Sequence, residues 1–366
     1  MTAIAAPAGG TPAPEATFVY VANAEDGDIG TYQLLDSGEL KVGPRVKVAP
    51  MVMPMAVSPD RRFLYAVSRA QPLSVHVLAI DAGTGTLTPV STSPLVDSFP
   101  YVALDKTGRF LLAASYAGNL VGVYAVGADG SVAGEPLQVI PVGRNAHSIG
   151  VDETNRFVYV PALGSDAIFM FTFDAKSGRL HPNIHAAHPM KAMSGPRHFV
   201  TSVDNRFLYV LSEFLCTVTT LAIDGTTGLL TEVSSASGLP PDSGLIPGAP
   251  RGPNPERNLD HDIWAADVHL TPNGKFLYVS ERTSSTLGAF SADGASGKLT
   301  YLASTPTERQ PRGFAIDPGG RFLVSAGEKS ATISVYAIDP GTGALRFLNK
   351  YPTGKGANWV EIVRCG

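Results

Sequence analysis

The sequence predicts an all-β fold, a seven-bladed β-propeller with four-stranded blades in which the C-terminal strand closes the first blade. Three observations support this prediction. A short hairpin pattern recurs along the chain, its spacing matches the length of a propeller blade, and the two ends of the chain complement each other.

The hairpin pattern is clearest in residues 195–214, G-P-R-H-F-V-T-S-V-D-N-R-F-L-Y-V-L-S-E-F. Residues 203–206 form an Asp- and Asn-containing turn, because these side chains tolerate the backbone angles of turns. Residues 207–211, F-L-Y-V-L, are an aromatic and β-branched run that is typical of a buried strand. The segment therefore reads as two short antiparallel strands joined by a tight turn.

The same turn-and-strand pattern begins at seven phenylalanines, which we use as anchors. Most are preceded by Arg or Lys and followed by a polar loop, a second strand pattern, and a turn rich in Asp, Gly and Thr. Neighbouring anchors are mostly about 45 to 50 residues apart, the period of a four-stranded blade. The anchors are Phe18, Phe63, Phe110, Phe157, Phe207, Phe276 and Phe322.

The two ends of the chain predict how the ring closes. The first anchor has no strand pattern before it, whereas residues 356–363, G-A-N-W-V-E-I-V, match the strand that is missing there. We expect residues 359–363 to pair with residues 18–23 as the innermost strand of the first blade, which removes an exposed sheet edge. Residues 17–366 are then a single domain, and residues 1–16, rich in Ala, Pro and Gly, are expected to be a flexible tail.

The composition excludes several classes of function. A net charge of -4 without a basic run gives no support for nucleic-acid binding, and no apolar stretch is long enough to span a bilayer. Residues 1–16 lack the basic start and apolar run of a signal peptide. Two cysteines do not make a disulfide framework, which favours a cytoplasmic location. The oligomeric state stays open, and a monomer is consistent with the sequence.

Aligning the blades places polar side chains at one mouth of the central channel. Ten residues before each anchor, and six residues after it, inner strands present side chains near the same end, because the two strands of each hairpin are antiparallel. The polar members come mainly from the fourth to seventh blades, whereas the first three blades offer mostly Met, Pro, Ala and Tyr. The resulting candidates for a site are His147, Arg197, Glu213, Arg282, Arg312, Arg69 and Tyr116, together with Asp267, which lies one residue after the first of these positions.

Such a cluster of charges is costly at a channel entrance unless the charges are paired, hydrated or used. The alternative is a solvated channel mouth with ion pairs and no substrate. Strand alternation predicts that His198 points away from the channel. Residues 238–262 form a long Pro- and Gly-rich insertion on the same face, either a lid over a site or a surface excursion, and we expect it to hang over the pocket.

Several short motifs resemble those of the seven-bladed propeller lactonase family, which includes propeller-type bacterial 6-phosphogluconolactonases and fungal carboxy-muconate lactonising enzymes. The resemblance extends from about residue 18 to residue 363. The site proposed for that family, one His, two Arg and one Glu, falls on His147, Arg197, Glu213 and Arg282. The motifs, in order, are R-N-A-H-S (144–148), G-P-R-H-F (195–199), S-E-F (212–214), A-A-D-V-H (265–269), S-E-R (280–282) and Q-P-R-G-F (310–314).

The resemblance implies a lactonase that acts on a small anionic substrate, first of all 6-phosphogluconolactone. His147 is the candidate base, with Glu213 orienting it or stabilising its charged form, and Arg197 and Arg282 hold the anionic group and the developing oxyanion. Arg312, Asp267, Arg69 and Tyr116 are expected to bind substrate. No metal or other cofactor is expected, because arginines lie among the few carboxylates. The alternatives are a muconate-type lactonising cycloisomerase, a lactonase for another acid, and a non-catalytic binding propeller.

Overall fold

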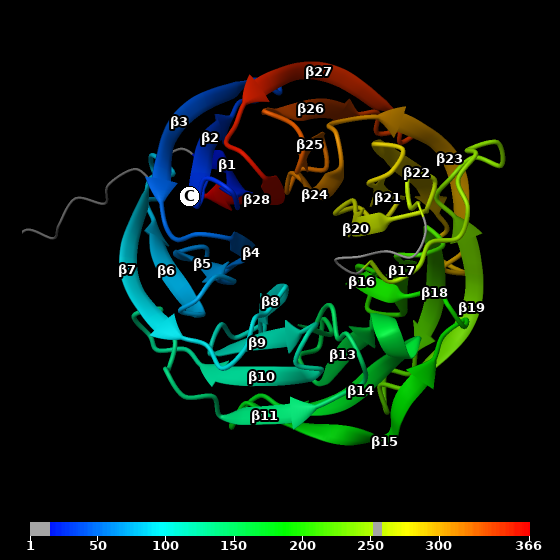
Figure 1. Cartoon of the computed structure of the whole chain (residues 1–366), viewed down its shortest axis with the longest axis horizontal. Helices are drawn as coiled ribbons and strands as arrows, with labels where there is room; N and C mark the ends of the chain where they lie inside the picture. The colour runs from blue at the N-terminus through cyan, green and yellow to red at the C-terminus, as the bar shows by residue number, and fades with distance from the viewer. Residues whose placement is uncertain (1–14, 252–257) are drawn as a thin grey trace, which may run out of the picture.

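The computed structural model describes residues 15–251 and 258–366, and these form a closed ring of seven four-stranded antiparallel sheets around a central channel (Figure 1). The predicted fold class and blade number are therefore confirmed. Part of the tail prediction (residues 1–14) and part of the long insertion (residues 252–257) lie outside the described residues. Within the tail prediction, Ala16 already belongs to the first strand.

The strands are given from the channel outward. The first blade is β28 (Ala357–Cys365), β1 (Ala16–Asn23), β2 (Asp28–Leu34) and β3 (Leu40–Lys47). The second is β4 (Val52–Val57), β5 (Phe63–Ser68), β6 (Ser74–Ile80) and β7 (Leu87–Pro94). The third is β8 (Tyr101–Leu104), β9 (Phe110–Ser115), β10 (Leu120–Ala125) and β11 (Gln138–Pro141). The fourth is β12 (Gly150–Val151), β13 (Phe157–Ala162), β14 (Ala167–Asp174) and β15 (Arg179–Pro189), with a 3-10 turn at Leu163–Ser165.

The remaining three blades follow the same order. The fifth is β16 (Pro196–Thr201), β17 (Phe207–Ser212), β18 (Thr217–Ile223) and β19 (Leu230–Ser237). The sixth is β20 (Ala265–Leu270), β21 (Phe276–Glu281), β22 (Thr286–Ala292) and β23 (Leu299–Pro306). The seventh is β24 (Pro311–Ile316), β25 (Phe322–Gly327), β26 (Thr332–Ile338) and β27 (Leu345–Pro352).

The C-terminal strand closes the ring as predicted. β28 pairs antiparallel with β1, with Trp359 opposite Ala22 and Val363 opposite Phe18. Figure 1 shows these two strands side by side, although they lie at opposite ends of the chain. The first blade thus joins both ends of the sequence, and neither strand leaves an unpaired edge in this sheet.

The phenylalanine anchors hold neighbouring blades together. Each anchor ring packs on a turn glycine of the next blade, so that a Cβ on Gly85 would lie 2.2 Å from Phe18. The cycle continues round the ring and closes where Phe322 of the seventh blade meets Gly38 of the first. Gly85 and Gly38 also adopt positive φ angles, +70° and +85°, which L side chains rarely adopt. The recurring Phe and Gly of the sequence are therefore two halves of one contact between blades.

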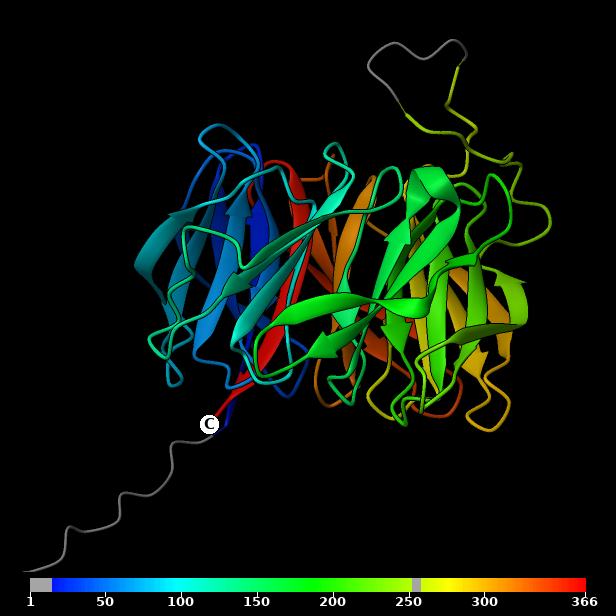
Figure 2. The ribbon, with the colours of Figure 1, turned by 90° about the horizontal axis from the view of Figure 1, so that it is seen from below.

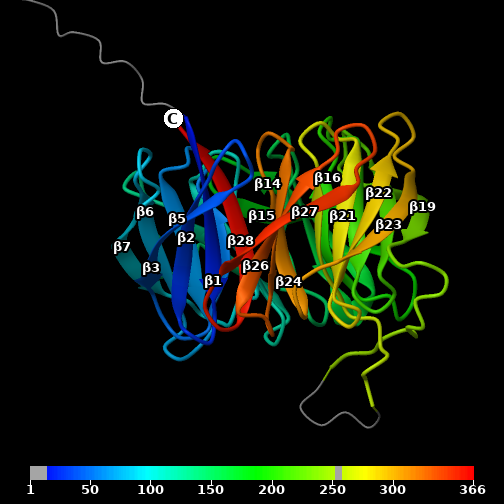
Figure 3. The ribbon, with the colours of Figure 1, turned by 90° about the horizontal axis from the view of Figure 1, so that it is seen from above.

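Inner strands begin at one face of the ring and run toward the other. The described ends of the segment between β19 and β20 extend from the face where inner strands begin, and the C-terminus lies at the opposite face (Figures 2 and 3). The predicted channel-mouth positions therefore lie on the face that carries the long insertion. Of the described residues, none belongs to a helix long and apolar enough to cross a membrane.

Candidate active site

A cavity of about 210 Å³ opens at the mouth of the channel where the inner strands begin. Its walls come from six of the seven blades and from the insertion before β20, so it exists only because the ring is closed. In the part of the chain that the structure describes, four arginines but a single carboxylate line it. The lining residues are Arg69, Pro100, Tyr116, His147, Glu213, Arg251, Trp264, Arg282 and Arg312.

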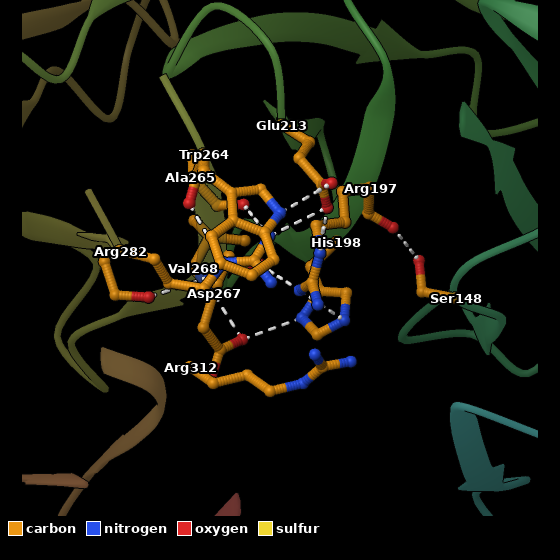
Figure 4. A network of polar contacts seen from close by, with 12 residues as sticks. Ser148, Arg197, His198, Glu213, Trp264, Ala265, Asp267, Val268, Arg282 and Arg312 are labelled. Atoms are coloured by element: carbon orange, nitrogen blue, oxygen red, sulfur yellow. Dashed lines mark hydrogen bonds and ion pairs between the residues drawn. The ribbon is translucent and has the colours of Figure 1, made fainter. Parts of the chain in front are cut away.

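Glu213 is the centre of the polar contacts in this pocket. Its carboxylate accepts hydrogen bonds from Arg197 Nε (2.7 Å) and Trp264 Nε1 (3.1 Å), and Arg282 Nη2 lies 3.0 Å away (Figure 4). Burial alone would raise the pKa of Glu213, but the charges of Arg282, Arg197 and Arg312 outweigh it and lower that pKa. Glu213 is therefore a carboxylate with its oxygens already engaged.

Arg197 lies behind Glu213 rather than at the pocket surface. Its side chain is 1% exposed, and Nη1 donates to the Ala266 carbonyl and to His198 Nε2 (3.0 Å). Burial lowers the pKa of Arg197 to about 10, so it remains charged at neutral pH. The structure gives Arg197 a supporting position, in contact with Glu213, where the sequence predicted direct contact with substrate.

Arg282 is fixed on three sides. It donates to the carbonyls of Trp264 (3.0 Å) and Ala265 (2.9 Å), and its guanidinium carbon lies 3.7 Å from the Trp264 ring centroid. Arg251, from the insertion, lies over the same ring at 4.0 Å. Trp264 thus holds two guanidinium groups at the pocket wall by cation–π contact. Sequence reasoning missed both Trp264 and Arg251; the position of Trp264 directly before the A-A-D-V-H motif was a usable signal.

Arg69 and Arg312 form the other cationic wall. Arg312 lies 3.5 Å from Glu328, whereas within the described residues no carboxylate pairs with Arg69, whose Nε donates to Ser98 Oγ (3.1 Å). Burial, followed by the nearby charges of Arg312 and Arg197, lowers the pKa of Arg69 to about 10. Two cations held close together without enough counter-charge make a site that favours an anion or a developing oxyanion.

His147 is the imidazole among the described residues that line the pocket. Its residue is 5% exposed, and Nδ1 is buried without a hydrogen-bond partner among the described residues. Its ring meets the edges of Tyr116 (5.7 Å between centroids) and His198 (5.2 Å). Burial, then the charges of Arg197 and its neighbours, lowers the pKa of His147 well below the usual value. The imidazole is therefore neutral, with a lone pair available.

The prediction that His198 points away from the channel is wrong. Its ring contacts Tyr101 of the third blade (4.9 Å) and Trp359 of the first (6.0 Å), which lie across the channel. The cause is a β-bulge in β16, where Pro196 faces Ser212 but Phe199 faces Val210. Such a bulge breaks the alternation of side chains, so Arg197 and His198 both turn inward. Similar register shifts occur in β4, β20, β24 and where β28 meets β1.

A buried polar chain continues from Arg197 down the channel. Because arginine only donates, His198 Nε2 must accept, and its Nδ1–H then donates to Asp267 Oδ1 (2.9 Å). The second Asp267 oxygen receives His269 Nε2 at 3.1 Å. Burial lowers the pKa of His198 to about 4, which keeps it neutral in this arrangement. Figure 4 shows the contacts from Glu213 to Asp267.

Asp267 therefore does not line the channel-mouth pocket, where the sequence placed it. It borders a separate deep-channel cavity of about 210 Å³, together with Tyr101, His198, Trp359 and Glu361. Of the eight predicted site residues, the structure brings six to one pocket, buries Arg197 directly behind Glu213, and sets Asp267 one layer lower. Among the described residues, no group of three or more His, Cys, Asp or Glu side chains is arranged to hold a metal ion.

The family model for the seven-bladed β-propeller lactonases matches residues 16–362. The chain belongs to this lactonase family. Among similar curated proteins, one from Serratia proteamaculans and one from Pectobacterium carotovorum are both named 6-phosphogluconolactonase. They are 39% and 38% identical to this lactonase-family chain, and each comparison spans 82% of it and 85% and 84% of the relative.

Two solved structures agree with this fold. The periplasmic gluconolactonase of Pseudomonas aeruginosa superimposes with a TM-score of 0.82 at 26% identity, covering 96% of this chain and 99% of that one. A Lactobacillus plantarum protein gives a TM-score of 0.83 at 23% identity, covering 96% and 100%, and at that identity it supports the fold alone.

Proposed function

We propose that this lactonase-family chain hydrolyses the lactone of a sugar acid, first of all 6-phosphogluconolactone to 6-phosphogluconate, the reaction for which its curated relatives are named. That reaction places it in the pentose phosphate pathway. The observation that supports the proposal most is the pairing of one neutral imidazole, His147, with a pocket wall of arginines. Such a pocket suits attack of water on an ester whose carbonyl oxygen gains negative charge.

His147 acts as the general base in this mechanism. The ring nitrogen that faces the pocket takes a proton from water as the water oxygen attacks the lactone carbonyl carbon. The carbonyl oxygen becomes an oxyanion, and the cations of Arg69 and Arg312 stabilise it. The carbon–oxygen bond of the ring then breaks, and the ring oxygen takes the proton from His147 to become a hydroxyl. The product is a single open-chain acid, because the leaving oxygen stays attached to the same molecule.

Glu213 has a different role from the one expected from the sequence. Within the described residues its hydrogen bonds go to Arg197 and Trp264, and none joins it to His147. We propose that Glu213 holds Arg282 in place and balances the charges of Arg197 and Arg282. Stabilisation of the oxyanion is then assigned to Arg69 and Arg312, because these two cations have less counter-charge nearby.

Steady-state hydrolysis of a panel of sugar lactones, with and without phosphate, tests the proposal. We expect turnover of 6-phosphogluconolactone above the spontaneous rate, unchanged by EDTA. Hydrolysis of other lactones but not of 6-phosphogluconolactone would mean that the substrate is a different sugar lactone. Conversion of a carboxy-muconate to its lactone would favour the cycloisomerase alternative. If no lactone of the panel is turned over, the non-catalytic binding propeller is the alternative that remains.

We also place the protein in the cytoplasm. Both cysteines, Cys216 and Cys365, are free and buried, which suits a reducing compartment. The periplasmic location of the Pseudomonas aeruginosa gluconolactonase is the alternative. Fractionation of the native host with an antibody against this chain separates the two compartments.

A further inference from the structure

A second cavity, of about 370 Å³, lies directly beside the channel-mouth pocket. The two share the side chains of Arg251, Trp264 and Arg282 as a common wall. The neighbouring cavity adds Arg309 and Lys329 to that wall. Arg309 lies in the connection between β23 and β24, and Lys329 follows β25, so both are on the face where inner strands begin.

The chemistry of this second cavity differs from that of the first. Among the described residues that line it, four cations, Arg251, Arg282, Arg309 and Lys329, lie with one carboxylate, Asp260. The hydroxyls of Thr283 and Ser285 add neutral hydrogen-bonding groups, and the lining within residues 15–251 and 258–366 contains no histidine or other neutral base. The set can bind an anion, but it holds no group suited to activating water.

The two added cations are available, although their backbone is fixed. Arg309 N–H donates to Ser330 Oγ (2.8 Å), and Lys329 N–H donates to the Arg309 carbonyl (3.3 Å). Within residues 15–251 and 258–366, neither the Arg309 guanidinium nor the Lys329 ammonium forms an ion pair or a side-chain hydrogen bond. The neighbouring Gln310 N–H donates to Ser285 Oγ (3.1 Å), which ties this connection to the sixth blade. The result is a rigid base that carries uncommitted positive charge.

We infer that this cavity, centred on Arg309 and Lys329, binds the phosphate group of the lactone substrate. The inference rests on the proposed function. In a sugar lactone the carboxyl group is closed into the ring, so the phosphate is the only anionic group of the substrate. Guanidinium and ammonium groups are the preferred protein partners of phosphate. The shared wall then lets one molecule place its phosphate on Arg309 and Lys329 and its carbonyl beside His147.

The channel-mouth pocket is the less suitable place for the phosphate. There Arg282 is paired with Glu213 and Arg312 with Glu328, while Arg69 faces the position assigned to the oxyanion. Phosphate bound at that point would also bring its charge next to the forming oxyanion. Two separate cationic regions, one for each negative charge, avoid this repulsion.

Paired kinetics on 6-phosphogluconolactone and unphosphorylated gluconolactone test the inference. The variants are Arg309→Ala, Lys329→Ala and the double variant. The control is Lys298→Ala, an exposed lysine in the β22–β23 turn at the opposite face. Loss of a charge-assisted hydrogen bond costs about tenfold or more in affinity. We expect kcat/KM for the phosphorylated lactone to fall by about tenfold or more beyond any fall on gluconolactone, mostly through KM, with the control unchanged.

Other results would overturn the inference. Equal falls in kcat/KM on both lactones would mean that the two side chains do not bind the phosphate. No change in kcat/KM on either lactone would mean the same. If Arg69→Ala removes the preference for the phosphorylated lactone while the double variant keeps it, the phosphate binds in the channel mouth.

A failure of the proposed function is distinguishable from these outcomes. If the unaltered protein hydrolyses neither lactone, the reaction is wrong, and calorimetric titration with 6-phosphogluconate then tests the cavity by itself. Binding that weakens by about tenfold or more in the double variant, with Lys298→Ala unchanged, supports the phosphate site; equal binding by all three proteins, or none, overturns it.

Discussion

Arg197 and Glu213 form a buried ion pair in which the arginine Nε lies 2.7 Å from a carboxylate oxygen, with the two side chains 1% and 10% exposed. The same oxygen lies 3.0 Å from Arg282, which is 2% exposed. One carboxylate therefore balances two cations that water does not reach. The arrangement joins the fifth and sixth blades, so it serves the ring as well as the pocket.

Replacing that carboxylate should cost stability. In Glu213→Gln the two buried arginines lose their counter-charge, and breaking a buried pair costs about 3 to 5 kcal/mol of unfolding free energy. The matched control is Glu328→Gln, whose pair with Arg312 is longer (3.5 Å) and partly exposed. We expect about 1 kcal/mol or less there. Urea unfolding of both variants measures the difference, and equal midpoints would contradict it.

His147→Ala should reduce kcat while the fold is kept. A positioned general base contributes about 100- to 10,000-fold to rate, and among the described residues no hydrogen bond to Nδ1 of the imidazole would be lost. His185→Ala, an exposed histidine of β15, is the control. Steady-state kinetics measures kcat of both variants, and circular dichroism checks that both keep the fold. Rates equal to those of the unaltered protein would remove His147 from the mechanism.

The pH dependence of activity should follow the low pKa of His147. A general base must be unprotonated, and burial with nearby arginines lowers its pKa well below the ordinary 6.5. As the pH falls through 6.5 the base therefore stays unprotonated, so kcat/KM should remain constant there and decline only at lower pH. A pH–rate profile on the best lactone checks this. An acid limb with its midpoint at 6.5 or above would show that a different group titrates.

The contact between an anchor phenylalanine and its turn glycine should contribute more to stability than a glycine of the same turn that makes no such contact. Gly228 has a φ of +71°, and a Cβ there would lie 2.3 Å from Phe157, whereas a Cβ on Gly225 of the same turn meets nothing within 4 Å. Gly228→Ala should cost about 1 to 2 kcal/mol from the backbone angle alone, plus the clash. Gly225→Ala should change little. Thermal unfolding of the pair compares them, and similar melting temperatures would refute the contact.

The sequence by itself determined the number of blades and the way the ring closes. These depend on local patterns, a Phe after each turn and a strand at the C-terminus that matches the missing one, which repeat at a nearly constant spacing. It also indicated which face carries the polar residues. His147 and Arg312 could be found because both lie ten residues before the anchor of their blade, and Glu213 and Arg282 because both lie six residues after it.

Only the tertiary structure decided how those side chains are used. The bulge in β16 turned His198 inward, because an extra residue breaks the alternation on which strand counting relies. Ring closure brought Trp264 and Arg251 to the pocket and left Asp267 a layer below it. Which cation pairs with Glu213, and which stays unpaired, depends on distances between blades far apart in sequence. Coulomb energy and burial vary steeply with those distances, and no pattern along the chain encodes them.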